Sequence, residues 1–169
     1  MKRRAPIIAA TVLALASLSS LAHAAGTEGW PTYEGAWFDV KYPKGFKVVP
    51  RQKSSTYEGR YDAVSFVSPD GNAEFYVFSP QWSGTPAWIA LAKGERIVSR
   101  STQSSATRKV DFVEVKGQGA KYYRAWADTQ SKVSNTRHTF GFKYSSKAAY
   151  NQYRARYLLF KASLNQYAD

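Results

Sequence analysis

Few side chains in this 169-residue sequence are suited to acid–base chemistry, and they are widely spaced. His138 directly follows Arg137, and such a pair could transfer a proton while the guanidinium neutralises an anionic substrate. Glu74 or Glu114 could supply the carboxylate that a phosphodiester-cleaving set also needs. The sequence therefore offers His138, Arg137 and one glutamate as a candidate hydrolytic set, as in a small basic ribonuclease-like hydrolase of phosphodiesters.

Other catalytic signatures are absent. The chain has no cysteine, which excludes thiol nucleophiles, thiolate metal sites and disulfides. The Gly-x-Ser-x-Gly pattern of serine hydrolases is missing, and Gly117-Gln118-Gly119 is too short to cradle a phosphate. Asp111 and Glu114 are the only acidic pair close together that a metal could use. We expect no metal, no cofactor and no enzymatic activity.

A second set of residues is suited to binding. Tryptophan and arginine together stack on flat groups and pair with anions. The alternative for Trp88 is packing between a helix and the sheet, and for Trp82 anchoring of a loop. The candidate binding residues are Trp82, Trp88, Arg96, Arg100, Arg124, Arg137 and His138.

The first 24 residues have the three parts of a cleavable signal peptide in the right order. Lys2, Arg3 and Arg4 give a positive start, Ile7 to Leu21 an apolar stretch of about fifteen residues, and Ala22-His23-Ala24 a small-residue cleavage pattern. The apolar stretch is too short for a membrane-spanning helix. We expect a periplasmic or secreted protein with no transmembrane segment after cleavage.

The remaining chain is strongly basic. Removing the three basic residues of the leader from the total of 24, and setting the rest against 12 acidic residues, leaves a net charge of +9. Such a charge favours anionic partners, and export makes nucleic acid a poor candidate. An anionic cell-envelope component or an unidentified protein is the expected partner, although the charge could also serve solubility alone.

Residues 25–32 are predicted to form a flexible leader and residues 33–169 a single domain. Alternation of apolar residues predicts a hairpin of 37–42 with 46–49, and strands at 63–67 and 75–78 joined by a Pro-Asp-Gly turn. Thr85-Pro86 predicts a short middle helix ending near Gly94. Further strands are expected at 96–102, 110–115, 122–127 and 136–144. The expected fold is α+β, with an antiparallel sheet of about six to eight strands.

A long amphipathic helix is predicted over 147–166, because aromatic and aliphatic residues recur there at spacings of three and four. Ser145 or Ser146 would cap it. Lys147, Arg154 and Lys161 follow one border of the apolar face at seven-residue intervals, where their stems can cover a hydrophobic contact. Leu158 and Leu159 fall outside this face and could mark a second contact.

The pattern Phe38-x-Val40-x-Tyr42-Pro43-x-Gly45-Phe46, then Val64-Ser65-Phe66-x-Ser68-Pro69, an aromatic strand and a helix from Tyr144 to Leu164, resembles the PsbP/Mog1-like families of small exported domains. The resemblance implies an antiparallel sheet flanked by helices. It also implies an accessory or binding module rather than an enzyme, with no family catalytic residues to transfer to this sequence. Two hypotheses follow, a non-enzymatic exported binding module and the phosphodiester hydrolase centred on His138.

Overall fold

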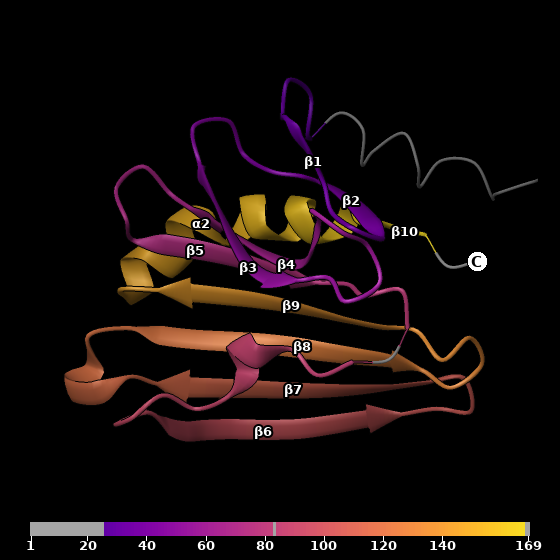
Figure 1. Ribbon diagram of the computed structural model, residues 1–169. Coiled ribbons are helices and arrows are strands. Elements are labelled where there is room, and N and C mark those ends of the chain that lie inside the picture. The colour runs from indigo at the N-terminus through magenta and orange to yellow at the C-terminus, as the bar shows by residue number, and fades with distance from the viewer. Residues whose placement is uncertain (1–25, 83, 168–169) are drawn as a thin grey trace, which may run out of the picture.

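Most of the alternating stretches form strands in the computed structural model, which describes residues 26–82 and 84–167. The expected signal peptide lies outside the described residues. Seven strands form one antiparallel sheet in the order β3-β4-β5-β9-β8-β7-β6 (Figure 1). Their bounds are β3 Lys47–Lys53, β4 Tyr61–Val67, β5 Ala73–Phe78, β6 Arg96–Ser104, β7 Arg108–Lys116, β8 Tyr123–Ser131 and β9 Arg137–Tyr144.

The predicted turn between β4 and β5 is confirmed. The amide of Gly71 donates to the carbonyl of Ser68, and Gly71 has a φ of 69°, which glycine adopts without steric cost. The carboxylate of Asp70 accepts from the Ser68 hydroxyl and from the Asn72 amide. These local bonds set the register in which β4 pairs with β5.

The predicted hairpin of 37–42 with 46–49 is wrong. The first of these stretches forms β2 (Phe38–Lys41), which pairs with β1 (Thr32–Glu34) on one side and β10 (Asn165–Gln166) on the other. Both edges of β2 are therefore occupied, and β3 pairs with β4 in the larger sheet instead. Within residues 25–32, which are predicted to form a flexible leader, residues 26–29 form a turn, Trp30 packs on the core, and Thr32 begins β1.

The long helix is confirmed as α2 (Lys147–Ala162), although it ends earlier than predicted because the chain then enters β10. The hydroxyl of Ser146 caps it by accepting from the amide of Ala149. In Figure 1, α2 lies behind the sheet and the segment after β5 crosses in front of it. Among the described residues, no helix is both long and apolar enough to cross a membrane.

The predicted middle helix is wrong, since only a single 3-10 turn forms at Ala87–Ile89. Helix continuation would need the carbonyls of Trp88 and Ala90 as acceptors for later amides. Both carbonyls instead accept from the guanidinium of Arg124 on β8. Ala90 is accordingly extended, with ψ at 137°.

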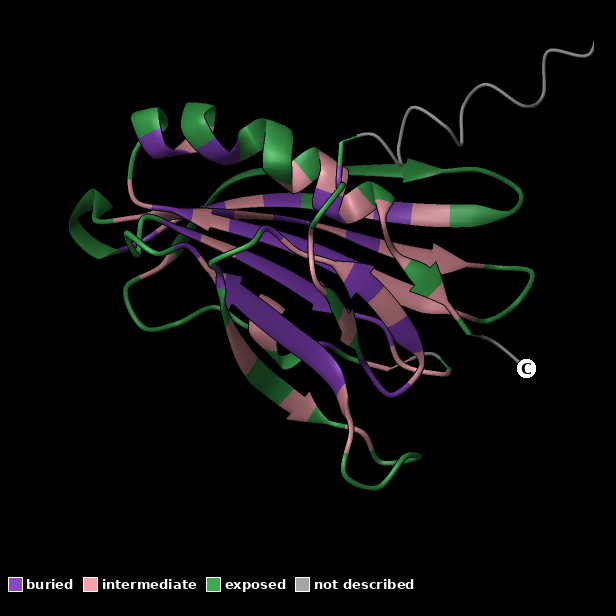
Figure 2. Ribbon diagram, turned by 90° about the horizontal axis from the view of Figure 1, so that it is seen from above, coloured by how far each residue is buried: buried purple, intermediate pink, exposed green. Residues whose placement is uncertain are grey.

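The main core lies between α2, the small sheet and one half of the large sheet. Figure 2 shows α2 with buried residues on the side toward the sheet and exposed residues on its outer side. The helix packs on β9, β5 and β2. The largest apolar side chains of this core are aromatic: Phe38, Phe46, Phe66, Phe75, Phe140, Phe142, Tyr144, Tyr153 and Phe160. The α+β class and the large antiparallel sheet are confirmed.

Candidate functional site

A groove runs between α2 and the part of the sheet that α2 leaves uncovered. It consists of two adjoining hollows of about 340 Å³ and 410 Å³. The residues shared by both hollows are Phe112, Ala127, Leu158 and Lys161. Volumes of this size suit small ligands or the side chains of a bound segment.

The floor of the groove follows from the alternation of β8. The β8 residues that face the groove include Ala125 and Ala127, and their neighbours on β9 are Phe142 and Phe140. The large phenylalanines lie under α2, whereas the small alanines leave the sheet surface low beside it. Phe112 on β7 and Leu158 on α2 border this low floor and remain 36% and 45% exposed. The groove therefore has an apolar floor open to solvent.

Lys161 lies where the two hollows meet, and it is half-buried. Its ammonium is 5.8 Å from the centre of the Phe140 ring and 5.7 Å from that of Tyr157. Burial lowers the pKa of Lys161 below its ordinary value because desolvation disfavours the charged form. None of the ion pairs formed by the described residues involves Lys161. A desolvated cation without an acidic partner favours an anionic ligand in this groove.

The opposite face of the sheet holds Arg124, one of the predicted binding residues. Its guanidinium pairs with Glu95 at 2.5 Å, and the two side chains are only 6% and 2% exposed. It also donates to the carbonyls of Trp88 and Ala90 and lies 4.9 Å from the ring centres of Trp88 and Trp126. The hydrogen bonds that Glu95 accepts from Arg124, from the Ala92 amide and from the Tyr122 hydroxyl lower its pKa to about 2. Arg124 thus clamps the segment after β5 onto the sheet.

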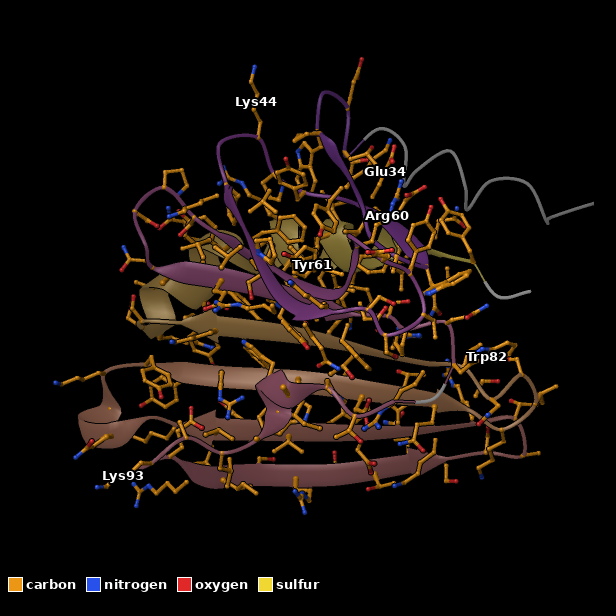
Figure 3. The ribbon with its side chains drawn as sticks, in the orientation of Figure 1. Glu34, Lys44, Arg60, Tyr61, Trp82 and Lys93 are labelled. Atoms are coloured by element: carbon orange, nitrogen blue, oxygen red, sulfur yellow. The ribbon has the colours of Figure 1, made fainter. Side chains whose placement is uncertain are left out.

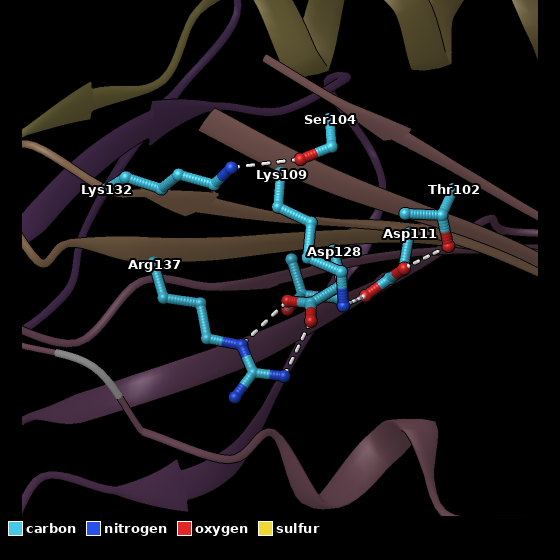
Figure 4. Close-up of polar contacts among 8 residues, drawn as sticks. Thr102, Ser104, Lys109, Asp111, Asp128, Lys132 and Arg137 are labelled. Atoms are coloured by element: carbon cyan, nitrogen blue, oxygen red, sulfur yellow. Dashed lines mark hydrogen bonds and ion pairs between the residues drawn. The ribbon is translucent and has the colours of Figure 1, made fainter. Parts of the chain in front are cut away.

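Arg137 forms a second clamp on this face. Its guanidinium makes two hydrogen bonds to Asp128, at 2.8 Å and 2.6 Å (Figure 4). It also donates to the carbonyl of Gly84, and Asp128 accepts from the hydroxyl of Thr139 at 2.7 Å. Because its donors are engaged within the chain, Arg137 holds the loop rather than presenting a free cation.

The two predicted tryptophans have different environments. Trp88 stacks on Tyr76 with ring centres 4.8 Å apart and meets Trp126 edge to face at 6.2 Å. It is part of the packing, as the alternative interpretation held. Trp82 is 45% exposed, and Figure 3 shows it at the opposite end of the crossing segment from Lys93. The structure does not bring the two indoles together.

The remaining predicted residues lie elsewhere. Arg96 and Arg100 are exposed on the edge strand β6, and Arg100 borders a polar hollow on the Arg137 face. His138 borders the groove on the other face. The predicted binding set therefore does not form one site, although a role in binding for its exposed members stays a prediction.

The candidate hydrolytic set is not assembled. Adjacent residues of a strand face opposite sides, so Arg137 and His138 are separated by the sheet. His138 is bound to Gln166 at 3.0 Å, and burial lowers its pKa. Glu74 pairs with Arg51 at 2.7 Å on the Arg137 face, and Glu114 accepts from the Tyr144 hydroxyl in the other hollow. No group of three or more potential metal-ligating side chains occurs among the described residues.

The groove was not predicted from the sequence, although one signal for it is present there. Arg154 and Lys161 were noted for their seven-residue spacing, and both line the groove. Leu158 was noted as lying outside the apolar face of the helix, and it forms part of the groove wall. The spacing indicated a shared border of α2, but it gave no sign that the neighbouring strands would be left uncovered.

Comparison with known proteins supports the fold. No protein-family model matches the chain, and no curated protein matches its sequence. The solution structure of cyanobacterial PsbP (CyanoP) from Synechocystis sp. PCC 6803 matches with a TM-score of 0.50 and 11% identity, over 81% of this chain and 92% of that one. The chain therefore has the PsbP-like fold that the sequence pattern indicated.

Two further structures are more distant. A protein from Bacteroides thetaiotaomicron matches with a TM-score of 0.46 and 15% identity, over 81% of this chain and 47% of that one. The Ran-binding protein Mog1p of Saccharomyces cerevisiae matches with a TM-score of 0.41 and 9% identity, over 82% of this chain and 97% of that one. Their lower scores add nothing to the fold assignment.

Proposed function

We propose that this protein is an exported, non-enzymatic binding module that captures an anionic partner in the groove between α2 and strands β6 to β8. The observation that carries the proposal is Lys161, a half-buried cation over an apolar floor with no ion-pair partner among the described residues. Keeping a desolvated charge unpaired is unfavourable. An anion that binds beside Lys161 would relieve that cost.

Two further features support binding rather than catalysis. Arg154 lines the same groove on α2, and Arg108 lies at its other end, so the cations are spread along its length. Arg137 and Glu74 lie on the face of the sheet opposite His138. Glu114 is on the same face as His138, but it lines the other hollow, where it accepts a hydrogen bond from the Tyr144 hydroxyl. The set of residues that the hydrolase hypothesis requires is therefore not assembled around His138. The positive net charge of the exported chain also attracts anionic partners, as the cations of the groove do.

Export is tested first. The full-length protein is produced with its own leader, and the cytoplasmic, periplasmic and medium fractions are compared. We expect recovery outside the cytoplasm with Ala25 at the N-terminus. Recovery in the cytoplasm with residues 1–24 intact would contradict export.

Binding is tested with 1-anilinonaphthalene-8-sulfonate, a probe that joins an anionic group to apolar rings, and with vesicles of phosphatidylglycerol or phosphatidylcholine. We expect the probe and the anionic vesicles to bind, more weakly as salt is added, and Lys161→Met to reduce probe binding. The matched control is Lys93→Met, an exposed lysine outside the groove. Equal probe binding by all three proteins would refute the groove as the site.

The hydrolase hypothesis is tested with RNA and bis(p-nitrophenyl) phosphate as substrates. We expect no turnover by the purified protein. Turnover that His138→Ala abolishes would overturn the proposal and favour the enzyme.

A further inference from the structure

The half of the sheet that α2 leaves uncovered is wide and long enough to accommodate one more helix. Strands in a sheet lie about 4.8 Å apart, so β8, β7 and β6 together span about 10 Å from first to last. A helix with its side chains is about 10–12 Å across. The strands are nine residues long, which corresponds to about 30 Å, the length of a helix of about 20 residues. A single extended peptide would occupy only one strand spacing.

The surface of the groove also suits a helix. Ala125 and Ala127 form a low floor, while Phe112 and Leu158 rise beside it. Apolar side chains at helical spacing can enter the low positions and pack against the two exposed residues, as in helix-in-groove recognition. A flat bilayer resting on α2 would be held about one helix diameter above this floor, so it would not contact Phe112.

The charges indicate what kind of helix would fit. Arg154 and Lys161 line the groove seven residues apart, a rise of about 10 Å along α2. Lys147 lies seven residues before Arg154, with its ammonium 4.4 Å from the ring centre of Tyr150, another groove residue. None of these three cations takes part in an ion pair among the described residues. Acidic residues at seven-residue spacing on a facing helix would meet this row.

A second copy of the chain is a poor occupant. Residues 147–162 of α2 contain four basic residues, Lys147, Arg154, Arg156 and Lys161, and no aspartate or glutamate. Placing the α2 of one copy in the groove of another would set cations against cations, which is unfavourable.

We propose that the groove binds an amphipathic helix of a protein partner, with its apolar face on Phe112, Ala127 and Leu158 and its acidic border toward Arg154 and Lys161. This inference rests on the proposed function and names the class of partner. In the complex, the partner helix would lie beside α2 and complete the helical layer on this face of the sheet.

The test uses three labelled peptides of 20 residues and the full exported protein. The first peptide is amphipathic, with leucine and alanine on one face and glutamate at seven-residue spacing on its border. The second has lysine in place of each glutamate. The third has the composition of the first in an order that is not amphipathic. We expect fluorescence anisotropy to show at least tenfold tighter binding of the first peptide than of either other peptide.

Variants locate the site. Ala127→Phe fills the floor, and Leu158→Glu places a negative charge on the wall at a side chain that is 45% exposed. We expect each to weaken binding of the first peptide at least tenfold. Lys93→Gln, at an exposed position outside the groove, is the control and should leave binding unchanged.

The outcomes separate this inference from the proposed function. Equal binding of the first and third peptides would overturn the proposal that the groove binds an amphipathic helix, while leaving anion binding intact. Groove-dependent binding of phosphatidylglycerol vesicles without binding of the first peptide would replace the protein partner with a membrane. Failure of every anionic probe would refute both proposals.

Discussion

The indole of Trp88 lies directly on the backbone of Gly141. A Cβ atom at residue 141 would stand 2.4 Å from the Trp88 ring, a distance that requires one of the two to move. The indole has little room to move, since it is stacked on Tyr76 and bordered by Trp126. Glycine weakens a strand interior, so the close approach of this ring explains its presence in the middle of β9.

Gly141→Ala should therefore destabilise the protein, although alanine in a strand normally improves on glycine by about 0.5–1 kcal/mol. Overpacking against the ring reverses the sign, and we expect a loss of about 1–3 kcal/mol in the free energy of unfolding. Urea unfolding followed by circular dichroism measures it. The control is the same substitution in a Trp88→Leu background, where the loss should largely disappear. An equal loss in both backgrounds would show that the indole is not the reason for the glycine.

The buried pair of Glu95 and Arg124 should be important for stability. Glu95→Gln leaves the Arg124 charge buried without its carboxylate, and breaking such a pair costs about 3–5 kcal/mol. The matched control is Asp111→Asn, which breaks the Lys109–Asp111 pair, whose side chains are 43% and 27% exposed. We expect that substitution to cost no more than about 1 kcal/mol. Equal losses in urea unfolding would contradict the clamp described for Arg124.

Acid should weaken the same clamp. The hydrogen bonds from Arg124 lower the pKa of Glu95 from 4.5 to about 2. A carboxyl with a lowered pKa contributes stability that is complete above its unfolded value and is lost as the pH falls through its folded value. The free energy of unfolding should therefore fall more steeply between pH 4.5 and about 2 in the natural protein than in Glu95→Gln. Parallel curves for the two proteins would contradict this assignment.

Much of the fold could be predicted because its signals are local. The β4–β5 turn depends on Asp70 and Gly71, and the start of α2 depends on Ser146, all close in sequence to what they organise. The pairing of β2 could not be predicted, because its second neighbour, Asn165–Gln166, lies near the other end of the chain. Alternation tells which side chains face a core, but it does not tell which strand lies alongside. The middle helix failed because Arg124, distant in sequence, takes its carbonyl acceptors.

The candidate site was less predictable for a related reason. An arginine in the sequence indicates a positive charge. Whether that charge is available to a ligand depends on partners such as Glu95 and Asp128, which only the fold brings beside it. One correction was accessible from the sequence: Arg137 and His138 are neighbours on a predicted strand and so had to face opposite sides. The seven-residue spacing of Arg154 and Lys161 was visible too, but their lack of partners was not.

Replacing Lys161 with an uncharged residue should stabilise the fold. Burial lowers its pKa below 10.5, so the unfolded protein binds this proton more tightly than the folded one, and the natural protein gains stability as the pH rises toward 10.5. Lys161→Met keeps an apolar stem against Phe140 and Tyr157 without the desolvated charge. At neutral pH we expect the free energy of unfolding to rise by about 0.5–2 kcal/mol, while the anionic probe binds less.

The gain from Lys161→Met should shrink as the pH rises toward 10.5, because burial makes the natural protein lose this charge more readily than the unfolded chain does. Lys93→Met, at an exposed position, should change neither stability nor binding. Urea unfolding at neutral pH and near pH 10.5 measures the difference. If Lys161→Met instead loses stability at neutral pH, the ammonium contributes to folding through its aromatic contacts, and its value as evidence for an anionic ligand disappears. If stability rises while binding falls, the chain retains an unfavourable charge at the place where a ligand would use it.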